Sequence, residues 1–426
     1  MKLRTTLTAA IAAGAAAVLA TGVAVGASSN PSGRAAQWSV SWSSALQPPV
    51  ASTPAFGPNW SAEGFSDQTI RQTIRLSSAG NHVRIRLSNL YGTGPLHVTG
   101  ATIAVTLDGA ATQPGTMHRL TFGGTRSVTI PAGRVTASDA AALRVVPLES
   151  LTITLFFAGA TGPSTFHEDG LTTSYRATGD HLSDLGTGAF TGATSHSSYY
   201  LDGVDVTGRY IRGTVVAFGD SITNGHNSTI GASKRYTDVL AGRLAAAHVP
   251  LAVANAGITG NLLLSQLPCF GEKGVARFQR DALDQPGVRT VILEEGTNDI
   301  WDSQANHNCG TKTTPVVTAR QIIGGYRALI RAAHARGIRV IGATMLPFKA
   351  SYEAPADFAK AEAVRKAVNQ WILTSGKCDA VEDFARAVAD PADPQQLNPA
   401  YNSGDSLHPN DAGYQAIAAA VNLSDL

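Results

Sequence analysis

The sequence has little cysteine, with only Cys269, Cys309 and Cys378 in 426 residues. Three cysteines are too few for the disulfide framework of a small secreted scaffold. They form no C-x-x-C pair, and His307 beside Cys309 has no two further ligands close by, so we expect no metal site. Hydrophobic residues make up 43% of the chain, which excludes a mainly disordered protein, and the length predicts two or three domains.

The sequence also lacks a large excess of positive or negative charge. The chain has 33 Lys and Arg against 31 Asp and Glu, and two of the basic residues, Lys2 and Arg4, precede an apolar run from Ala9 to about Ala27. This run has the form of a secretory signal peptide, because its Ala and Gly residues and its small-residue end argue against a transmembrane anchor. We therefore expect residues 1–27 to be removed and the protein to be secreted.

Removal of Lys2 and Arg4 from the 33 basic residues leaves 31, equal to the number of acidic residues. A formally neutral chain without a basic stripe predicts no nucleic-acid partner. Loss of the apolar run likewise predicts no stable insertion into a membrane.

Residues 36–210 have the period-two pattern of half-buried strands, as in Val83 to Leu87 and in Leu151 to Leu155. Turn-forming groups such as Asp108-Gly109 separate the runs, and no long amphipathic helix intervenes. This pattern predicts an all-β domain, either a sandwich or a jelly roll.

Residues 211–426 have a different pattern. Continuous apolar runs at Val215 to Phe218, Val288 to Leu293 and Ile338 to Ala343 predict strands that are buried on both faces, as in a parallel sheet. Amphipathic helices are predicted at residues 316–336, 359–373 and 412–421. Alternating strands and helices indicate an α/β domain, which has its site at the carboxyl ends of the strands.

Two segments of this α/β domain suggest nucleophilic chemistry. Ser221 follows Gly219-Asp220 at the end of the first apolar strand, and Asp405 and His408 stand three residues apart before the last helix. A serine hydroxyl becomes a nucleophile when an imidazole takes its proton, and a carboxylate orients that imidazole. Taken alone, the serine segment is more typical of a turn or a helix cap, and Asp405 and His408 are also compatible with a cap and a surface histidine.

Two further segments offer donors for a developing oxyanion. Gly260 follows the strand at Leu251 to Ala254, and Asn298 lies in Gly296-Thr297-Asn298-Asp299 after the strand that ends near Leu293. A backbone N–H at the glycine and a side-chain amide at the asparagine are the groups that such a site requires. Tight turns are the alternative interpretation of both segments.

Taken together and in this order, the four segments resemble the SGNH hydrolases, also called GDSL esterases and lipases. The resemblance implies a three-layer flavodoxin-like α/β domain with a parallel sheet. It also implies that Ser221 is the nucleophile, His408 the general base and Asp405 its orienting partner. The oxyanion would be bound by Ser221, Gly260 and Asn298, with no cofactor.

The N-terminal segment is similar to the β-rich domain of some bacterial secreted members of that family, at residues 38–42, 68–72 and 86–89. We expect it to carry no catalytic residue and to be dispensable for the chemical step. The α/β-hydrolase alternative is disfavoured because the chain has no G-x-S-x-G motif.

The predicted function is hydrolysis of carboxylic esters, on a small-molecule or polysaccharide substrate with a short acyl group or an acetylated sugar. A lipase or phospholipase, an acyltransferase with the same triad, and a glycan-binding protein with a vestigial α/β domain are the alternatives. Polar loops frame the expected crevice, and we expect Trp301, Phe348 and Tyr401 at its rim. We also expect a disulfide between Cys269 and Cys309, because both lie in polar loops after strand ends.

Overall fold

Strands dominate the chain up to residue 207, as the period-two pattern predicts. The computed structural model describes residues 37–53, 56–208, 211–301, 315–351 and 355–426.

One antiparallel sheet has the order β1-β14-β3-β9 and the other has the order β12-β2-β10-β5-β6, with β7 paired to β5. The strands of the first sheet are β1 (Ser39–Ser43), β14 (Leu201–Thr207), β3 (His82–Ser88) and β9 (Val135–Ala137). Those of the second are β12 (Ser174–Thr178), β2 (Gln68–Arg75), β10 (Ser150–Phe157), β5 (Gly100–Asp108), β6 (Ala111–Thr112) and β7 (His118–Arg119). Two short pairs join β4 (Leu96–Val98) to β8 (Val128–Ile130) and β11 (Phe166–His167) to β13 (Ser198–Tyr199).

One hydrophobic core fills the space between these sheets. Val83, Ile85 and Leu87 of β3 are fully buried in it together with Leu151 and Ile153 of β10, while the arginines between the β3 positions point to the opposite face of the sheet. Alternation therefore places every second residue of these strands in the core. The predicted β-rich character of the N-terminal region is confirmed.

The C-terminal part has a five-stranded parallel sheet with the order β16-β15-β17-β18-β19. Its strands are β15 (Gly213–Gly219), β16 (Leu251–Gly257), β17 (Val288–Glu294), β18 (Arg339–Ala343) and β19 (Ala380–Glu382). The helices are α1 (Ser221–Asn224), α2 (Tyr236–Ala246), α3 (Gly274–Phe278), α4 (Thr297–Trp301), α5 (Ala319–His334), α6 (Pro355–Thr374), α7 (Phe384–Val388) and α8 (Asp411–Ala420). The predicted parallel sheet is confirmed.

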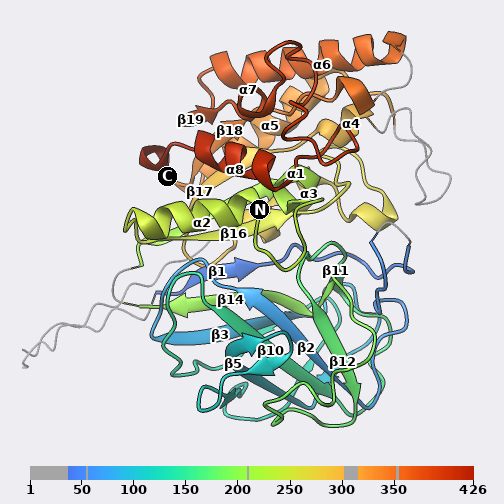
Figure 1. Cartoon of the computed structure of the whole chain (residues 1–426), viewed down its shortest axis with the longest axis vertical. Coiled ribbons are helices and arrows are strands. Elements are labelled where there is room, and N and C mark those ends of the chain that lie inside the picture. Colours follow the sequence, from blue (N-terminus) through green and yellow to red (C-terminus); the bar gives the residue numbers. More distant parts are fainter. Residues whose placement is uncertain (1–36, 54–55, 209–210, 302–314, 352–354) are drawn as a thin grey trace, which may run out of the picture. The chain divides into compact units, whose positions relative to one another are not determined.

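Hydrophobic side chains of this sheet point to both of its faces. Val215 and Ala217 of β15 lie in a cluster with α2, α7 and α8, whereas Val216 and Phe218 lie in a second cluster with α3, α5 and α6. Figure 1 shows these two groups of helices around the sheet. Continuous burial along β15 follows from this coverage and explains why its sequence does not alternate.

Strand β1 connects the β-rich and the α/β parts. It pairs with β14, but Val40 belongs to the α/β core while Trp42 belongs to the β-rich core. The backbone N–H of Val40 also donates to Pro286 O at 3.0 Å. Residues 36–426 form one compact unit and residues 209–210 lie outside the described ranges, so the boundary at residues 210 and 211 stays a prediction.

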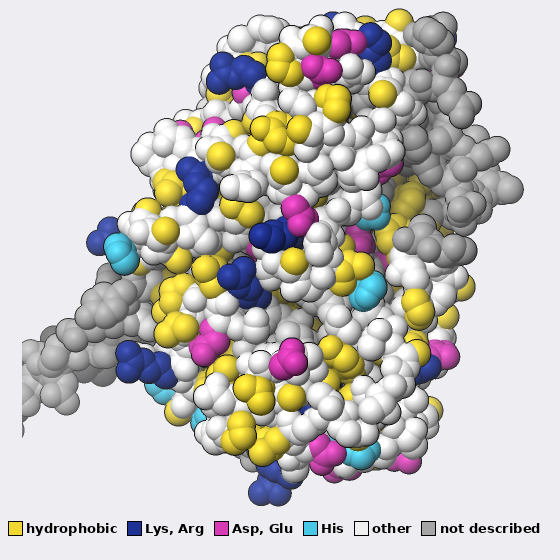
Figure 2. Space-filling view, in the orientation of Figure 1, with side chains coloured by type: hydrophobic (Ala, Val, Ile, Leu, Met, Phe, Trp, Pro, Cys, Tyr) yellow, Lys and Arg dark blue, Asp and Glu magenta, His cyan; other side chains and the backbone are white. Residues whose placement is uncertain are grey.

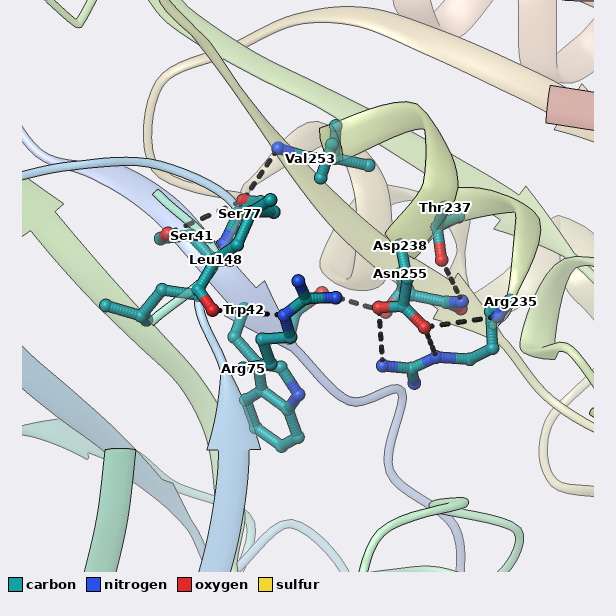
Figure 3. Close-up of a pocket in the computed structure, with 13 residues that line it drawn as sticks. Ser41, Trp42, Arg75, Ser77, Leu148, Arg235, Thr237, Asp238, Val253 and Asn255 are labelled. Atoms are coloured by element: carbon teal, nitrogen blue, oxygen red, sulfur yellow. Dashed lines mark hydrogen bonds and ion pairs between the residues drawn. The ribbon is translucent and has the colours of Figure 1, made fainter. Parts of the chain in front are cut away.

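Polar contacts continue this junction beside β1 (Figure 3). Ser77 Oγ accepts from Val253 N at 2.9 Å, and Ser43 Oγ donates to Asn255 O at 2.8 Å. Arg235 and Asp238 form an ion pair at the start of α2. The cavity that these residues line has a volume of about 20 Å³, which is room for about one water molecule rather than for a substrate.

The surface agrees with the balanced charge of the sequence. On the face drawn in Figure 2, Lys and Arg side chains are scattered among acidic ones. Within the described ranges, no helix combines the length and the apolar character needed to cross a membrane.

Candidate active site

The segment of Ser221 is fixed by close backbone packing at the end of β15. A Cβ atom at Gly219 would lie 1.9 Å from Glu294 O, so only glycine fits there. Asp220 then caps α1, because its side chain accepts from Ile222 N at 3.0 Å. Ser221 is the first residue of α1 and is 3% exposed.

The structure brings Ser221, His408 and Asp405 together. Ser221 Oγ lies 2.9 Å from His408 Nε2, and His408 Nδ1 donates to Asp405 Oδ2 at 2.6 Å. Ser221 and His408 are 187 residues apart in the sequence, so the fold alone makes this contact. The arrangement allows His408 to take a proton from Ser221 while Asp405 holds the ring in the required tautomer.

The carboxylate of Asp405 is held from several sides. Its Oδ1 accepts from the backbone N–H groups of Leu407 and His408, and Asn227 Nδ2 donates to its Oδ2 at 2.9 Å. Burial works to raise the pKa of Asp405, but the hydrogen bonds from His408 and Leu407 outweigh it and hold this pKa well below its usual range. Asp405 is therefore ionised at neutral pH.

The His408 ring has the opposite balance. Burial lowers the pKa of His408, while the hydrogen bond to Asp405 works to raise it, and the net direction is downward. A lowered pKa favours the neutral imidazole, which is the form that accepts a proton.

Gly260 and Asn298 lie at the carboxyl ends of the two strands beside β15. Gly260 has φ of +77°, in the left-handed region that favours glycine, and the ring of Phe270 leaves no room for a Cβ atom there. Asn298 is 6% exposed and its Nδ2 donates to Asn261 O at 2.8 Å. This bond ties Asn298 to the residue next to Gly260.

Asp299 completes the support of the glycine loop. Its carboxylate accepts from Leu263 N at 2.6 Å and from Leu264 N at 2.9 Å. The amide of Asn298 and the carboxylate of Asp299 thus both bind the main chain of the loop that follows Gly260.

Comparisons with known proteins agree with this geometry. Residues 217–416 match the GDSL-like Lipase/Acylhydrolase family. They belong to that family. The predicted resemblance is therefore confirmed, and the membership supports a serine ester hydrolase. A comparison with curated proteins found no match.

Solved structures similar to the GDSL-like domain each cover about half of this chain. A lipolytic protein of the G-D-S-L family from Desulfitobacterium hafniense is 20% identical, with 48% of this chain and 95% of that chain covered and a TM-score of 0.35. A GDSL-like lipase from Bacteroides thetaiotaomicron is 20% identical, with 50% and 88% covered and a TM-score of 0.36. An acetyl xylan esterase from Geobacillus stearothermophilus is 21% identical, with 49% and 93% covered and a TM-score of 0.37.

Arg277 is a structural residue of the GDSL-like domain that the sequence analysis missed. Its buried guanidinium donates to Gly219 O, to Ala256 O and to Asn261 Oδ1, at 2.7 to 2.8 Å. It thereby joins the ends of β15 and β16 to the glycine loop. No motif pointed to Arg277, because its partners lie in separate segments of the chain and two of them are main-chain carbonyls.

Three buried carboxyl groups lie at the carboxyl ends of β15 and β17. Burial raises the pKa of Asp220 to about 7 and raises the pKa of Glu294 and of Glu295 well above their ordinary values. All three side chains are fully buried, so their carboxyl groups are protonated more readily than ordinary ones. In the described part of the chain, no group of three or more His, Cys, Asp and Glu has a geometry that could hold a metal ion.

The predicted rim residues have different outcomes. The placement of Phe348 at the rim is wrong: the side chain is 0% exposed and packs edge-on against Phe358 of α6, with the ring centroids 6.3 Å apart. Tyr401 is half-buried in the turn before α8, and its role stays a prediction. The side chain of Trp301 lies outside the described part of the structure.

The predicted disulfide has one partner outside the described residues. Cys309 lies between residues 302 and 314, so the pairing of Cys269 with Cys309 stays a prediction. Among the described residues, Cys378 is a free thiol.

Two polar residues beside the triad were also missed. His226 and Asp169 form a hydrogen-bonded pair next to His408, and Asp169 comes from the β-rich domain. The sequence offered only a histidine shortly after the nucleophile block and a distant His-Glu-Asp run as signals.

Proposed function

We propose that the protein is a secreted carboxylic ester hydrolase that works through an acyl-serine intermediate on Ser221. The observation that carries this proposal is the continuous hydrogen-bonded path from Ser221 Oγ through the His408 ring to Asp405. Membership of residues 217–416 in the GDSL-like family supports the same reaction.

The reaction follows from the roles of these three side chains. His408 takes the proton of Ser221 as its oxygen attacks the ester carbonyl, and Asp405 stabilises the imidazolium that forms. His408 then gives the proton to the departing alcohol, which leaves the acyl group on Ser221. Water, activated by the same histidine, releases the acid and restores the free serine.

Stabilisation of the oxyanion is assigned to three donors. These are the backbone N–H groups of Ser221 and Gly260 and the second amide hydrogen of Asn298, since the first donates to Asn261 O. The Asn298 contact orients the amide before the substrate arrives. A fixed donor needs no reorganisation during the reaction, which is why it lowers the barrier.

The substrate that we propose carries a short acyl group on a small alcohol or a sugar. The apolar run from Leu262 to Leu264 comes shortly after Gly260 and could begin a long acyl groove, but Leu262 and Leu263 are buried in the domain interior, at 1% and 0% exposure, and Leu264 is half-buried against the same core. Recognition of a long acyl chain would require a sizeable apolar groove, because each buried methylene contributes only about 0.8 kcal/mol to binding. Tyr401 and Trp301 remain the proposed rim.

Three further features belong to this proposal. Residues 1–27 act as a signal peptide for secretion, and a disulfide joins Cys269 to Cys309. The catalytic domain has a three-layer flavodoxin-like architecture, which is supported by the strand order 2-1-3-4-5 within its sheet and by helices on both faces.

The test is a panel of esters graded from acetyl to long acyl chains, together with acetylated polysaccharides, assayed with the mature protein and with Ser221→Ala. We expect kcat/KM to be highest for acetyl or butyryl esters and turnover to be absent in Ser221→Ala. A steady rise in kcat/KM toward long chains would indicate a lipase, and ester formation with an added alcohol in place of hydrolysis would indicate an acyltransferase. Undiminished activity of Ser221→Ala would refute the serine mechanism.

A further inference from the structure

Beside the triad, a second histidine–aspartate pair lies against the catalytic histidine. His226 Nδ1 donates to Asp169 Oδ2 at 2.6 Å. The His226 ring meets the His408 ring edge-on, with 4.7 Å between the ring centroids and 73° between the ring planes. The two side chains of the pair are 20% and 10% exposed, so solvent screens them only in part.

The pair is fixed in place by residues from three other segments of the chain. Asp169 Oδ2 also accepts from Thr259 Oγ1 at 2.7 Å, and Asn224 Nδ2 donates to Asp169 O at 2.9 Å. On the other side, the hydroxyl of Tyr414 donates to His226 O at 2.7 Å. The first bond holds the Asp169 carboxylate, and the other two hold the main chain of Asp169 and of His226 in place.

The loop that carries His226 makes a second contact, with Asp405. The next residue, Asn227, has φ of +66° and donates to Asp405 Oδ2 at 2.9 Å. Adjacent residues of one loop thus contact both the base and its orienting carboxylate. A loop that only closed a turn would need neither contact.

The charges around the pair favour a cation on His226. Burial works to lower the pKa of His226, but Asp169 and then Asp405 outweigh it, so this pKa lies above the ordinary value. Burial lowers the pKa of His408, and the proximity of His226 lowers it further. As the pH falls, His226 is therefore protonated before His408. The other titratable groups that face the pair or its loop are His167, Glu168, Arg235, Asp411 and Tyr414.

We propose that His226, held by Asp169, is a positioning residue whose positive charge keeps His408 in its neutral, basic form and so extends ester hydrolysis to lower pH. The proposal rests on the proposed function, because it assigns His408 as the general base. It also gives the β-rich domain a part in the reaction, since Asp169 comes from the loop after β11.

The experiment measures kcat/KM for a small activated ester from about pH 4 to about pH 9 with wild type, His226→Gln, Asp169→Asn and the double variant. Loss of the His226 charge leaves Asp169 as an uncompensated anion, so the acid limb of His226→Gln should move up by about one pH unit. On the acid limb, well below its midpoint, this shift corresponds to about a tenfold loss of kcat/KM relative to wild type at the same pH. The plateau at alkaline pH should change much less. The double variant removes both charges and should return most of the way to wild type.

The matched control is His334→Gln, which breaks another histidine–aspartate pair, with Asp379, on the far end of α5. Its acid limb should coincide with that of wild type. Thermal unfolding of each variant shows whether it is folded at the assay temperature.

Two results would overturn the inference while leaving the ester hydrolase intact. One is an acid limb of His226→Gln that matches wild type, and the other is an equal shift in the single and the double variant, which would mean a structural role without a charge effect. Hydrolysis that persists in Ser221→Ala would instead remove the proposed function itself.

Discussion

The two histidine–aspartate pairs at the candidate active site are built in opposite ways. Asp405 and His408 lie three residues apart on one turn of the catalytic domain, and Asp169 and His226 lie 57 residues apart and come from the β-rich and the catalytic part. Both pairs have the same separation, 2.6 Å between nitrogen and oxygen. The first pair depends on local backbone geometry, whereas the second exists only while the two parts of the chain are packed together.

The two parts of the chain also contribute different residues to the candidate site. The GDSL-like domain carries the proposed nucleophile, base and oxyanion donors. The β-rich part supplies Asp169 and a set of buried polar contacts, such as the bond from Arg86 to Gln285 Oε1 at 2.6 Å. The expectation that the β-rich domain is dispensable for the chemical step stays a prediction, and Asp169 now gives a specific reason to test it.

Removal of one histidine at a time separates the two pairs most clearly and has the largest expected effect. His408→Ala should lower kcat by about 10⁴-fold or more, because the triad acts as a unit. Asp405→Ala should be roughly a hundredfold less severe, since a carboxylate orients the base but does not accept the proton of the serine. Initial rates with a small activated ester measure both effects.

The control for these variants is His181→Ala, because His181 forms a surface pair with Asp184 in the β-rich domain. It should retain wild-type kcat. If His226→Gln lost as much activity as His408→Ala at every pH, the distinction between a base and its positioning partner would be wrong.

The contribution of the β-rich part to stability comes next in size. Arg86→Ala should lower the free energy of unfolding by about 3–5 kcal/mol, because it leaves the buried Asp205 and the nearly buried Asp202 without their shared partner. Denaturant unfolding measures this loss. The rate of ester hydrolysis below the unfolding transition should stay close to that of wild type.

Arg84→Ala provides the comparison, since Arg84 also binds Asp205 but is 24% exposed. Its loss should cost about 1 kcal/mol or less. Equal losses in the two variants would show that burial of Arg86 between the two parts contributes nothing beyond the ion pair itself.

The oxyanion donor gives the smallest of the three effects and tests the catalytic domain alone. Asn298→Ala should lower kcat by about 10² to 10³-fold with little change in KM, because the amide acts mainly in the transition state. Steady-state kinetics separate the two constants. Asn369→Ala is the matched control: Asn369 is also buried and binds the backbone of Met345, so its loss should affect stability and leave kcat unchanged.

A change in KM without a change in kcat for Asn298→Ala would contradict the oxyanion assignment. The Asn298 bond to Asn261 O would then be its main role.

Local patterns explain which features could be predicted from the sequence. Continuous apolar runs indicated the parallel strands, and the spacing of Asp405 and His408 placed both on one turn. Phe348 could not be placed in this way, because a residue after a strand end can point to the crevice or to the core, and only the packing of α6 decides it. The contact of Asp169 with His226 depends on two distant loops that no periodic pattern relates.

The most direct test of the central claim is covalent labelling with a fluorophosphonate, which reacts with an activated serine. Peptide mass spectrometry should find one adduct, on Ser221, at near-stoichiometric level in wild type and in His334→Gln. Labelling should be absent in Ser221→Ala and strongly slowed in His408→Ala. An adduct on a different serine, or ester hydrolysis that continues after complete labelling, would contradict the assignment of Ser221 as the nucleophile.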